Sequence, residues 1–210
     1  MPTYSNYNTT PAQVDSTKNP SYIQFIDNLI QGADVIFLDT DTAAKCKPFE
    51  ELIKTISPML AKYKKKIIFP QAGMHELRQQ ATSIDTRTRE KAERTLEGLN
   101  ALSTVGIVGF RGNPNLAETA GEYIIKYVCQ HIFDEDIVVL TQDGDLARDC
   151  RLFGDFKSTH MNHTVVCKRI SDAYGRLNNF EFRSNSTEDN REDTIAPQNN
   201  SKEILKRYGQ

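Results

Sequence analysis

Short apolar runs alternate with longer amphipathic stretches along the middle of the chain. The runs are rich in Val and Ile, which is typical of strands buried on both faces of a sheet. They predict five strands, at residues 34–38, 66–69, 105–110, 137–140 and 164–170. The intervening stretches repeat apolar residues at helical spacing and predict helices at residues 20–30, 48–63, 71–80, 86–102, 116–133 and 146–153.

Strands that alternate with helices form βαβ units, in which the crossover is almost always right-handed. We therefore predict a three-layer α/β/α sandwich with a central, mostly parallel sheet of four or five strands. The apolar pattern is confined to residues 20–180, which we expect to form one domain. Residues 1–19 and 181–210 are polar and aperiodic, so we expect both to be disordered, apart from a short terminal helix at 203–208.

Charge and cysteine content narrow the class of protein. The net charge of −2 excludes a generally basic nucleic-acid coat, so any nucleic acid would have to bind a local basic patch. The four cysteines show no CxxC spacing, which favours free thiols in a reducing compartment. The sequence contains neither a signal peptide nor an apolar run near the ~18 residues of a membrane span. We predict a cytoplasmic protein without a membrane segment.

Acidic residues follow two of the predicted strands directly. The first strand runs into Asp39-Thr40-Asp41, and the fourth runs into Thr141-Gln142-Asp143-Gly144-Asp145. Open α/β sheets bind their ligands at the carboxyl ends of the strands, and right-handed crossovers would bring these two ends together. Clustered carboxylates repel one another and are stabilised by a hard divalent cation. The sequence therefore predicts a metal site that includes Asp39 and Asp143.

Three further acids are candidates for the same site. Glu76 lies on the short helix after the second strand. Glu118 and Glu122 are four residues apart and share one face of the helix before the fourth strand. A single acid usually serves as a helix cap or a loop charge, so these three are weaker candidates than the two acids at the strand ends.

Four short segments that contain these acids follow one another along the chain. They are Leu38-Asp39-Thr40, Met74-His75-Glu76-Leu77 after the strand Ile67-Ile68-Phe69-Pro70, Gly121-Glu122-Tyr123-Ile124-Ile125, and Thr141-Gln142-Asp143-Gly144-Asp145-Leu146. Together they resemble the PIN-domain nucleases, a family of single-domain, metal-dependent ribonucleases. The resemblance covers residues 34–170. Its third acid is usually Asp, whereas this chain has Glu122, with Glu118 as the competing assignment.

The resemblance implies a complete set of site residues. The catalytic, metal-binding acids would be Asp39, Glu76, Glu122 and Asp143, with Asp145 as a further metal ligand and Asp41 nearby. They would hold Mg²⁺ or Mn²⁺, which activates a water for hydrolysis of single-stranded RNA. Thr40 and Thr141 would orient ligands or the water. The substrate would also contact a basic rim, with Lys65, Arg78 and Arg148 as main candidates beside Lys64, Lys66, Arg87 and Arg89.

Two other functions remain open at the level of sequence. Residues 37–42 also resemble the nucleophile motif of haloacid-dehalogenase-type phosphatases, in which Asp39 would accept the phosphoryl group and Asp41 would be the acid/base. The lysine that this family needs is poorly matched, because Lys126 lies inside a predicted helix. The third interpretation is a PIN-like scaffold that binds RNA or protein without cleavage.

The sequence leaves several properties of such a nuclease undecided. Endo- and exonuclease action stay open, as do the roles of toxin, processing enzyme and defence enzyme. Many relatives of this type dimerise, so a homodimer is one option, and the oligomeric state stays open. The tail at residues 181–210 could bind an inhibitory or adaptor protein, or serve only as a linker.

Overall fold

The structure is a computed structural model that describes residues 19–114, 118–157, 163–171 and 173–180. The helices are α1 (Pro20–Gly32), α2 (Thr40–Ala43), α3 (Lys47–Lys62), α4 (Gln71–Gln80), α5 (Thr86–Thr104), α6 (Ala120–His131) and α7 (Gly144–Lys157). The strands are β1 (Val35–Leu38), β2 (Ile67–Pro70), β3 (Val108–Arg111), β4 (Ile137–Leu140), β5 (Val165–Ile170) and β6 (Leu177–Asn179). The predicted disordered ends and the helix at 203–208 lie outside the described residues, except for residue 19.

These strands form one sheet in the order β3-β2-β1-β4-β5-β6. Neighbours from β3 to β5 are parallel, and only β6 runs antiparallel, against β5. The prediction of an α/β fold with a mostly parallel sheet is confirmed. The chain moves outward from β1 through β2 to β3 and then returns to the other side of β1 as β4. Ligands bind at such a switch point in open α/β sheets.

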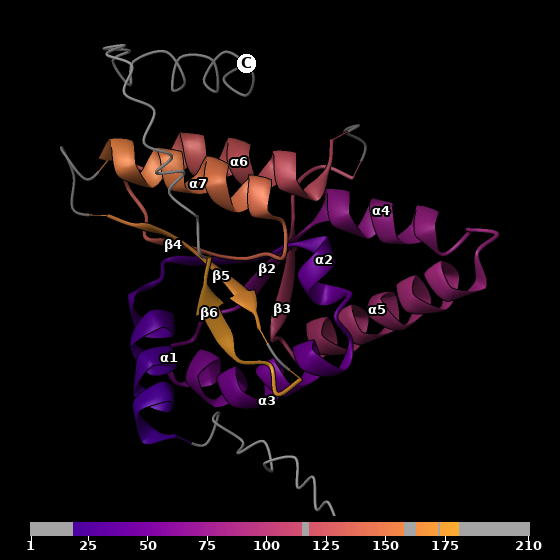
Figure 1. Cartoon of the computed structure of the whole chain (residues 1–210), viewed down its shortest axis with the longest axis horizontal. Coiled ribbons are helices and arrows are strands. Elements are labelled where there is room, and N and C mark those ends of the chain that lie inside the picture. Colours follow the sequence, from indigo (N-terminus) through magenta and orange to yellow (C-terminus); the bar gives the residue numbers. More distant parts are fainter. Residues whose placement is uncertain (1–18, 115–117, 158–162, 172, 181–210) are drawn as a thin grey trace, which may run out of the picture.

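Helices cover both faces of the sheet (Figure 1). Side chains alternate across a strand, so Ile36 and Leu38 of β1 join one apolar cluster while Val35 and Phe37 join the other. The first cluster contains buried residues of α1, α3, α4 and α5, and the second contains those of α6 and α7. This arrangement makes three layers. No helix among the described residues is both long and apolar enough to cross a membrane.

Two elements were not predicted. Helix α2 is a single turn with the polar sequence Thr-Asp-Thr-Ala, which is too short to show a helical apolar period. Strand β6 has three residues, too few to show an alternating pattern, although Leu177 is buried and its amide donates a hydrogen bond to the Tyr22 hydroxyl at 2.7 Å. The sheet consequently has six strands among the described residues rather than four or five.

Two elements begin later in the structure than the sequence pattern predicts. The third strand begins at Val108 rather than 105, because α5 continues to Thr104 and its last turn includes the next residues. The sixth helix begins at Ala120 rather than 116, because Thr119 caps it. Thr119 and Glu122 form a capping box, in which each side chain bonds the backbone amide of the other.

Candidate functional site

The carboxyl ends of β1 and β4 lie side by side and carry Asp39 and Thr141. The register pairs Leu38 with Leu140, and the Asp39 amide extends the ladder by donating to the Leu140 carbonyl at 2.9 Å. Asp39 is 6% exposed and Thr141 is fully buried. The predicted meeting of these two strand ends is therefore confirmed.

A chain of hydrogen bonds links Asp39 to Asp143. The Thr141 hydroxyl donates to Asp39 Oδ2 at 2.9 Å and accepts from the Asp143 amide at 2.9 Å. Asp143 Oδ1 in turn accepts from the amides of Asp145 at 2.8 Å and Leu146 at 3.3 Å. Asp143 thus caps α7 with one oxygen, which fixes the position of its carboxylate next to β4.

Glu76 reaches the same edge of the sheet from α4. The Thr40 hydroxyl donates to Glu76 Oε2 at 2.7 Å, and Glu76 Oε1 accepts from the Ala120 amide at 2.9 Å. Helix α4 comes this close because residue 73 is Gly. A Cβ at Gly73 would lie 2.8 Å from both Thr40 Oγ1 and the Phe69 ring. Glu76 therefore joins α2, α4 and the start of α6 at one point.

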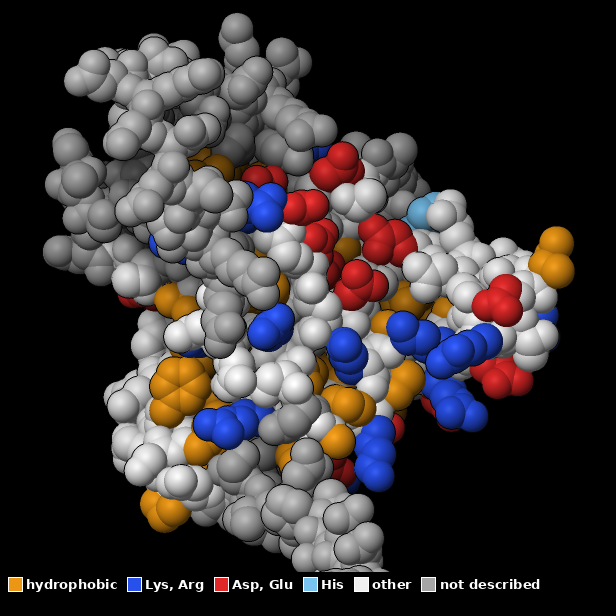
Figure 2. Space-filling model, in the orientation of Figure 1, with side chains coloured by type: hydrophobic (Ala, Val, Ile, Leu, Met, Phe, Trp, Pro, Cys, Tyr) orange, Lys and Arg blue, Asp and Glu red, His pale blue; other side chains and the backbone are white. Residues whose placement is uncertain are grey.

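Burial dominates the electrostatics of this site. It raises the pKa of Asp39 from its ordinary value of 3.8 to about 6, and the negative charges of Asp41 and Glu76 add to the increase. The hydrogen bond from Thr141 opposes the shift without cancelling it. Figure 2 shows acidic side chains gathered on this face, over the region where α2, α4, α6 and α7 meet. A nearby cation would stabilise the ionised form of Asp39.

The two candidates for the third acid already have structural partners. Glu122 Oε2 accepts from the Thr119 amide at 2.8 Å in the capping box, and its side chain is exposed. The Glu118 side chain is only 7% exposed and forms an ion pair with Lys126 at 2.9 Å. Neither glutamate is hydrogen-bonded to Asp39, Glu76 or Asp143 in the described part of the chain. The hydrogen-bonded site therefore consists of these three acids with Thr40 and Thr141.

Lys65 lies away from this site. It precedes β2, so it belongs to the amino edge of the sheet, opposite the edge that carries Asp39. Its ammonium group donates to the carbonyl of Gln31 at 2.6 Å and to the carbonyl of Ala33. These contacts satisfy the C-terminal end of α1. We therefore remove Lys65 from the predicted substrate contacts.

The other basic residues that were predicted to contact the substrate lie on different elements around the acids. Arg148 lies near the start of α7 and pairs with Asp145 at 2.7 Å, which places it at the border of the site. Arg78 is exposed in the last turn of α4. Arg89 Nη1 donates to the Ser83 carbonyl at 3.2 Å, within the turn between α4 and α5.

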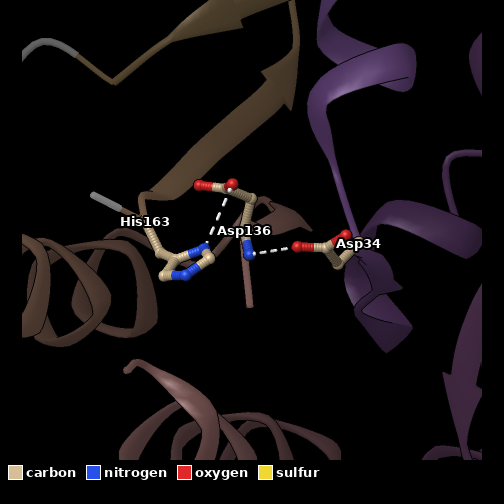
Figure 3. Close-up of side chains that lie close together, drawn as sticks. All are labelled: Asp34, Asp136 and His163. Carbon is tan, nitrogen blue, oxygen red and sulfur yellow. Dashed lines mark hydrogen bonds and ion pairs between the residues drawn. The ribbon is translucent and has the colours of Figure 1, made fainter. Parts of the chain in front are cut away.

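A second group of metal-ligand types lies at the amino edge and was not predicted. Asp34, Asp136 and His163 have ligand atoms within 4.8 Å of one another, and they are the only such group among the described residues (Figure 3). The predicted acids at the carboxyl edge are more widely spaced. Asp34 Oδ2 accepts from the Asp136 amide at 2.8 Å, and Asp136 accepts from the amide and hydroxyl of Thr164. These bonds join the starts of β1, β4 and β5.

The signal for this second group was present in the sequence. Asp34 and Asp136 stand directly before β1 and β4, while Asp39 follows β1 directly and Asp143 follows β4 after two residues. Burial alone would raise the pKa of Asp136, but hydrogen bonds from Thr164 and the neighbouring His163 lower it below its ordinary value. Oxygens that are already satisfied by donors need no cation. The group therefore closes the sheet edge rather than forming a second site.

Comparison with known proteins gives no identification of the chain. No protein-family model matches it. No curated protein is significantly similar to it either. The fold and the side chains at the β1–β4 switch point are therefore the basis for any assignment of function.

Proposed function

We propose that the chain is a PIN-like, metal-dependent ribonuclease that hydrolyses phosphodiester bonds of single-stranded RNA. One observation carries the proposal. Asp39 is a buried carboxyl with a raised pKa at the switch point, bonded through Thr141 to Asp143 and flanked by Glu76. A structural role does not require a desolvated acid among other acids, because that arrangement costs stability.

By residue type, the acids at the carboxyl edge suit a hard divalent cation, and an ion would draw their ligand atoms closer than they lie in this structure. Asp39, Glu76 and Asp143 would hold Mg²⁺ or Mn²⁺ through carboxylate oxygens, with Asp145 and Glu122 as outer candidates. When bound, such an ion lowers the pKa of a water and stabilises charge on the phosphate. Thr141 restrains Asp39 Oδ2, and Thr40 restrains Glu76 Oε2. These hydroxyls keep the carboxylates in position before the substrate arrives.

The order of the acids along the chain supports the same proposal. Asp39 after β1, Glu76 on α4, Glu122 on α6 and Asp143 after β4 follow the order of the acids in the PIN-domain nucleases that the chain resembles. The phosphatase alternative is less well supported, because Lys126 pairs with Glu118 rather than with Asp39. A homodimer, a cytoplasmic location and a protein partner for residues 181–210 stay predictions.

A cleavage assay tests the proposal. Wild-type protein, Asp39→Asn and Asp143→Asn are incubated with a labelled single-stranded RNA in Mn²⁺, Mg²⁺ or EDTA. We expect cleavage by the wild type in either metal, and none in EDTA or with either variant. Asp136→Asn, at the opposite sheet edge, is the matched control and should cleave like wild type per folded molecule. Absence of wild-type cleavage across several RNAs in both metals would favour the non-cleaving scaffold.

A further inference from the structure

An arginine stands in line with Asp39 on the β3 side of the sheet. The register pairs Arg111, the last residue of β3, with Pro70, the last residue of β2. The register between β1 and β2, continued by two residues, places Pro70 beside Asp39. Arg111 therefore lies two strand spacings from Asp39, about 9.6 Å across the carboxyl edge.

A second arginine stands in line with Asp39 on the other side. Thr141 lies beside Asp39, and its amide donates to the Lys168 carbonyl at 3.0 Å. The register between β4 and β5, continued by one residue, then places Thr141 beside Arg169. Arg169 is thus also two strand spacings from Asp39, about 9.6 Å. The row has Asp39 at its centre and an arginine at each end.

The three side chains lie on the same face of the sheet. Alternation along β1 puts Asp39 on the face that α6 and α7 cover. Arg111 Nη1 donates to the Tyr127 hydroxyl of α6 at 2.9 Å, so it lies on this face too. Arg169 comes two residues after Cys167, which packs against the same cluster. A ligand that crosses the row would meet all three groups.

Neither arginine is paired with a carboxylate in the described part of the chain. Both are exposed. The hydrogen bond of Arg111 goes to the neutral Tyr127 hydroxyl, which in turn donates to Glu135 at 2.7 Å. The Arg169 guanidinium lies over the Phe180 ring at 5.7 Å and donates no hydrogen bond within the described residues.

Other basic side chains around this edge are neutralised by acids. Arg148 pairs with Asp145 at 2.7 Å, and Lys126 pairs with Glu118 at 2.9 Å. Acids are therefore available on this side of the molecule, and two of its basic residues use them. The two arginines in line with Asp39 keep their charge for another partner.

We propose that a single-stranded nucleic acid crosses the carboxyl edge along this row, with Arg111 and Arg169 bound to phosphates on either side of the one at Asp39. This path rests on the proposed function for the identity of the strand as RNA and for the cation at Asp39. The cation would neutralise the acidic centre of the row, and guanidinium groups bind phosphate oxygens in pairs. An extended single strand presents its phosphates one after another, as a row of this kind requires.

Binding is measured apart from cleavage, with the full chain carrying Asp143→Asn, on a labelled single-stranded RNA. Ca²⁺ is present to neutralise the remaining acids. Adding Arg111→Gln or Arg169→Gln should weaken binding about tenfold each, the value of one charge-assisted hydrogen bond. Each should also lower the slope of log affinity against log salt by about 0.7, to the same extent for different RNA sequences.

Arg94→Gln is the matched control. Arg94 is exposed on α5, whose buried residues pack against the opposite face of the sheet. The substitution removes the same charge from the same residue type, away from the row. It should change affinity less than about twofold, because salt screens charges beyond about 10 Å.

Lysine variants separate phosphate binding from a structural role. Arg111→Lys and Arg169→Lys keep the positive charge but lose the planar contact with the rings of Tyr127 and Phe180. Both should bind within about threefold of the parent, because the charge supplies most of a phosphate contact. Lysine variants that bind as weakly as the glutamine variants would show that the arginines act through packing, and would overturn the proposal.

Cleavage kinetics give a second readout in the otherwise wild-type chain with Mn²⁺. Arg111→Gln and Arg169→Gln should raise KM about tenfold and change kcat less than about twofold, as expected for contacts equal in ground and transition state. A fall in kcat alone, with KM unchanged, would contradict a role in holding the strand.

The outcomes separate this path from the proposed function. If the wild type cleaves RNA but both glutamine variants bind like the parent, the path is overturned and the nuclease stands. If both variants lose binding but the wild type cleaves nothing, the path stands and the nuclease falls. Loss of binding at only one arginine would overturn a strand that crosses Asp39 to both sides.

Discussion

Both edges of the sheet carry aspartates next to β1 and β4. The hydrogen bonds and neighbouring charges of these aspartates differ between the two edges. β1 and β4 each have an aspartate at both ends, with Asp34 and Asp136 at the amino edge and Asp39 and Asp143 at the carboxyl edge. At the amino edge, Asp136 accepts two hydrogen bonds from Thr164 and has His163 beside it. At the carboxyl edge, Asp39 accepts from the Thr141 hydroxyl and the Thr40 backbone and faces two other acids.

The pKa values record this difference. Burial raises the pKa of both aspartates, but donors outweigh it at Asp136, whose pKa is lowered, and not at Asp39, whose pKa is about 6. The balance between burial and hydrogen-bond donors therefore separates a structural acid from a candidate ligand more clearly than proximity does. The tightest group of ligand atoms among the described residues, at the amino edge, is the better satisfied one.

The largest expected difference between the edges is in catalysis. Asp39→Asn should lower metal-dependent RNA cleavage at least about a hundredfold, because a bound ion contributes several kcal/mol to stabilising the reacting phosphate. Asp136→Asn should leave the rate per folded molecule unchanged. Rates are measured with equal concentrations of folded protein, checked by circular dichroism. Equal losses in both variants would remove the functional distinction between the edges.

The next difference is in the pH dependence of stability without metal. The pKa of Asp39 is higher in the folded state than its ordinary 3.8, so its stabilising contribution is complete below pH 4 and is lost as pH rises through about 6. The loss is about 3 kcal/mol for a shift of this size. Asp39→Asn should therefore be about as stable as wild type at pH 4 and more stable at pH 7.5. Urea denaturation in EDTA at both values measures this.

Metal binding should offset the stability that is lost when Asp39 ionises, and it should act at the carboxyl edge alone. At a Mn²⁺ concentration a hundred times the dissociation constant, the ion should stabilise the folded wild type by about 2.7 kcal/mol. Asp143→Asn should lose most of this gain, and Asp136→Asn should keep it. Thermal melts with and without Mn²⁺ provide the comparison. An equal gain in the Asp143 variant would place the ion elsewhere.

The smallest effect should be the structural one at the amino edge. Asp136→Asn weakens the bonds from Thr164 to a charged acceptor and should destabilise the fold by about 1–2 kcal/mol at pH 7. The pKa of Asp136 is lowered, so this contribution is present at neutral pH and is lost as pH falls below the ordinary carboxyl range. Denaturation at pH 7 and pH 3 should show a deficit that shrinks in acid. A deficit that grows in acid would contradict this account.

Much of the site could be predicted because it depends on strand ends. Asp39 and Asp143 follow buried strands, and the handedness of crossovers then places them together. Lys65 could also have been excluded, since a residue just before a parallel strand belongs to the opposite edge from one just after it. The Thr119-x-x-Glu122 spacing likewise indicates a capping box, which accounts for a Glu at this position without a metal.

The exact spacing of the acids could not be predicted. It depends on the close contact that Gly73 permits between α2 and α4. Such distances follow from the packing of side chains far apart in the sequence, which no local periodicity encodes. Strand β6 was missed for the same reason, because its three residues gain their structure from β5 and α1.

The bond between Leu177 and Tyr22 has a consequence for synthesis of the protein. It joins residues 155 positions apart, and it ties the last described strand to the first helix. During translation, α1 emerges from the ribosome first and must wait for β6 before this contact can form. Until then the partners of β5 and α1 are incomplete. We expect this contact to form only after about residue 180 has left the exit tunnel.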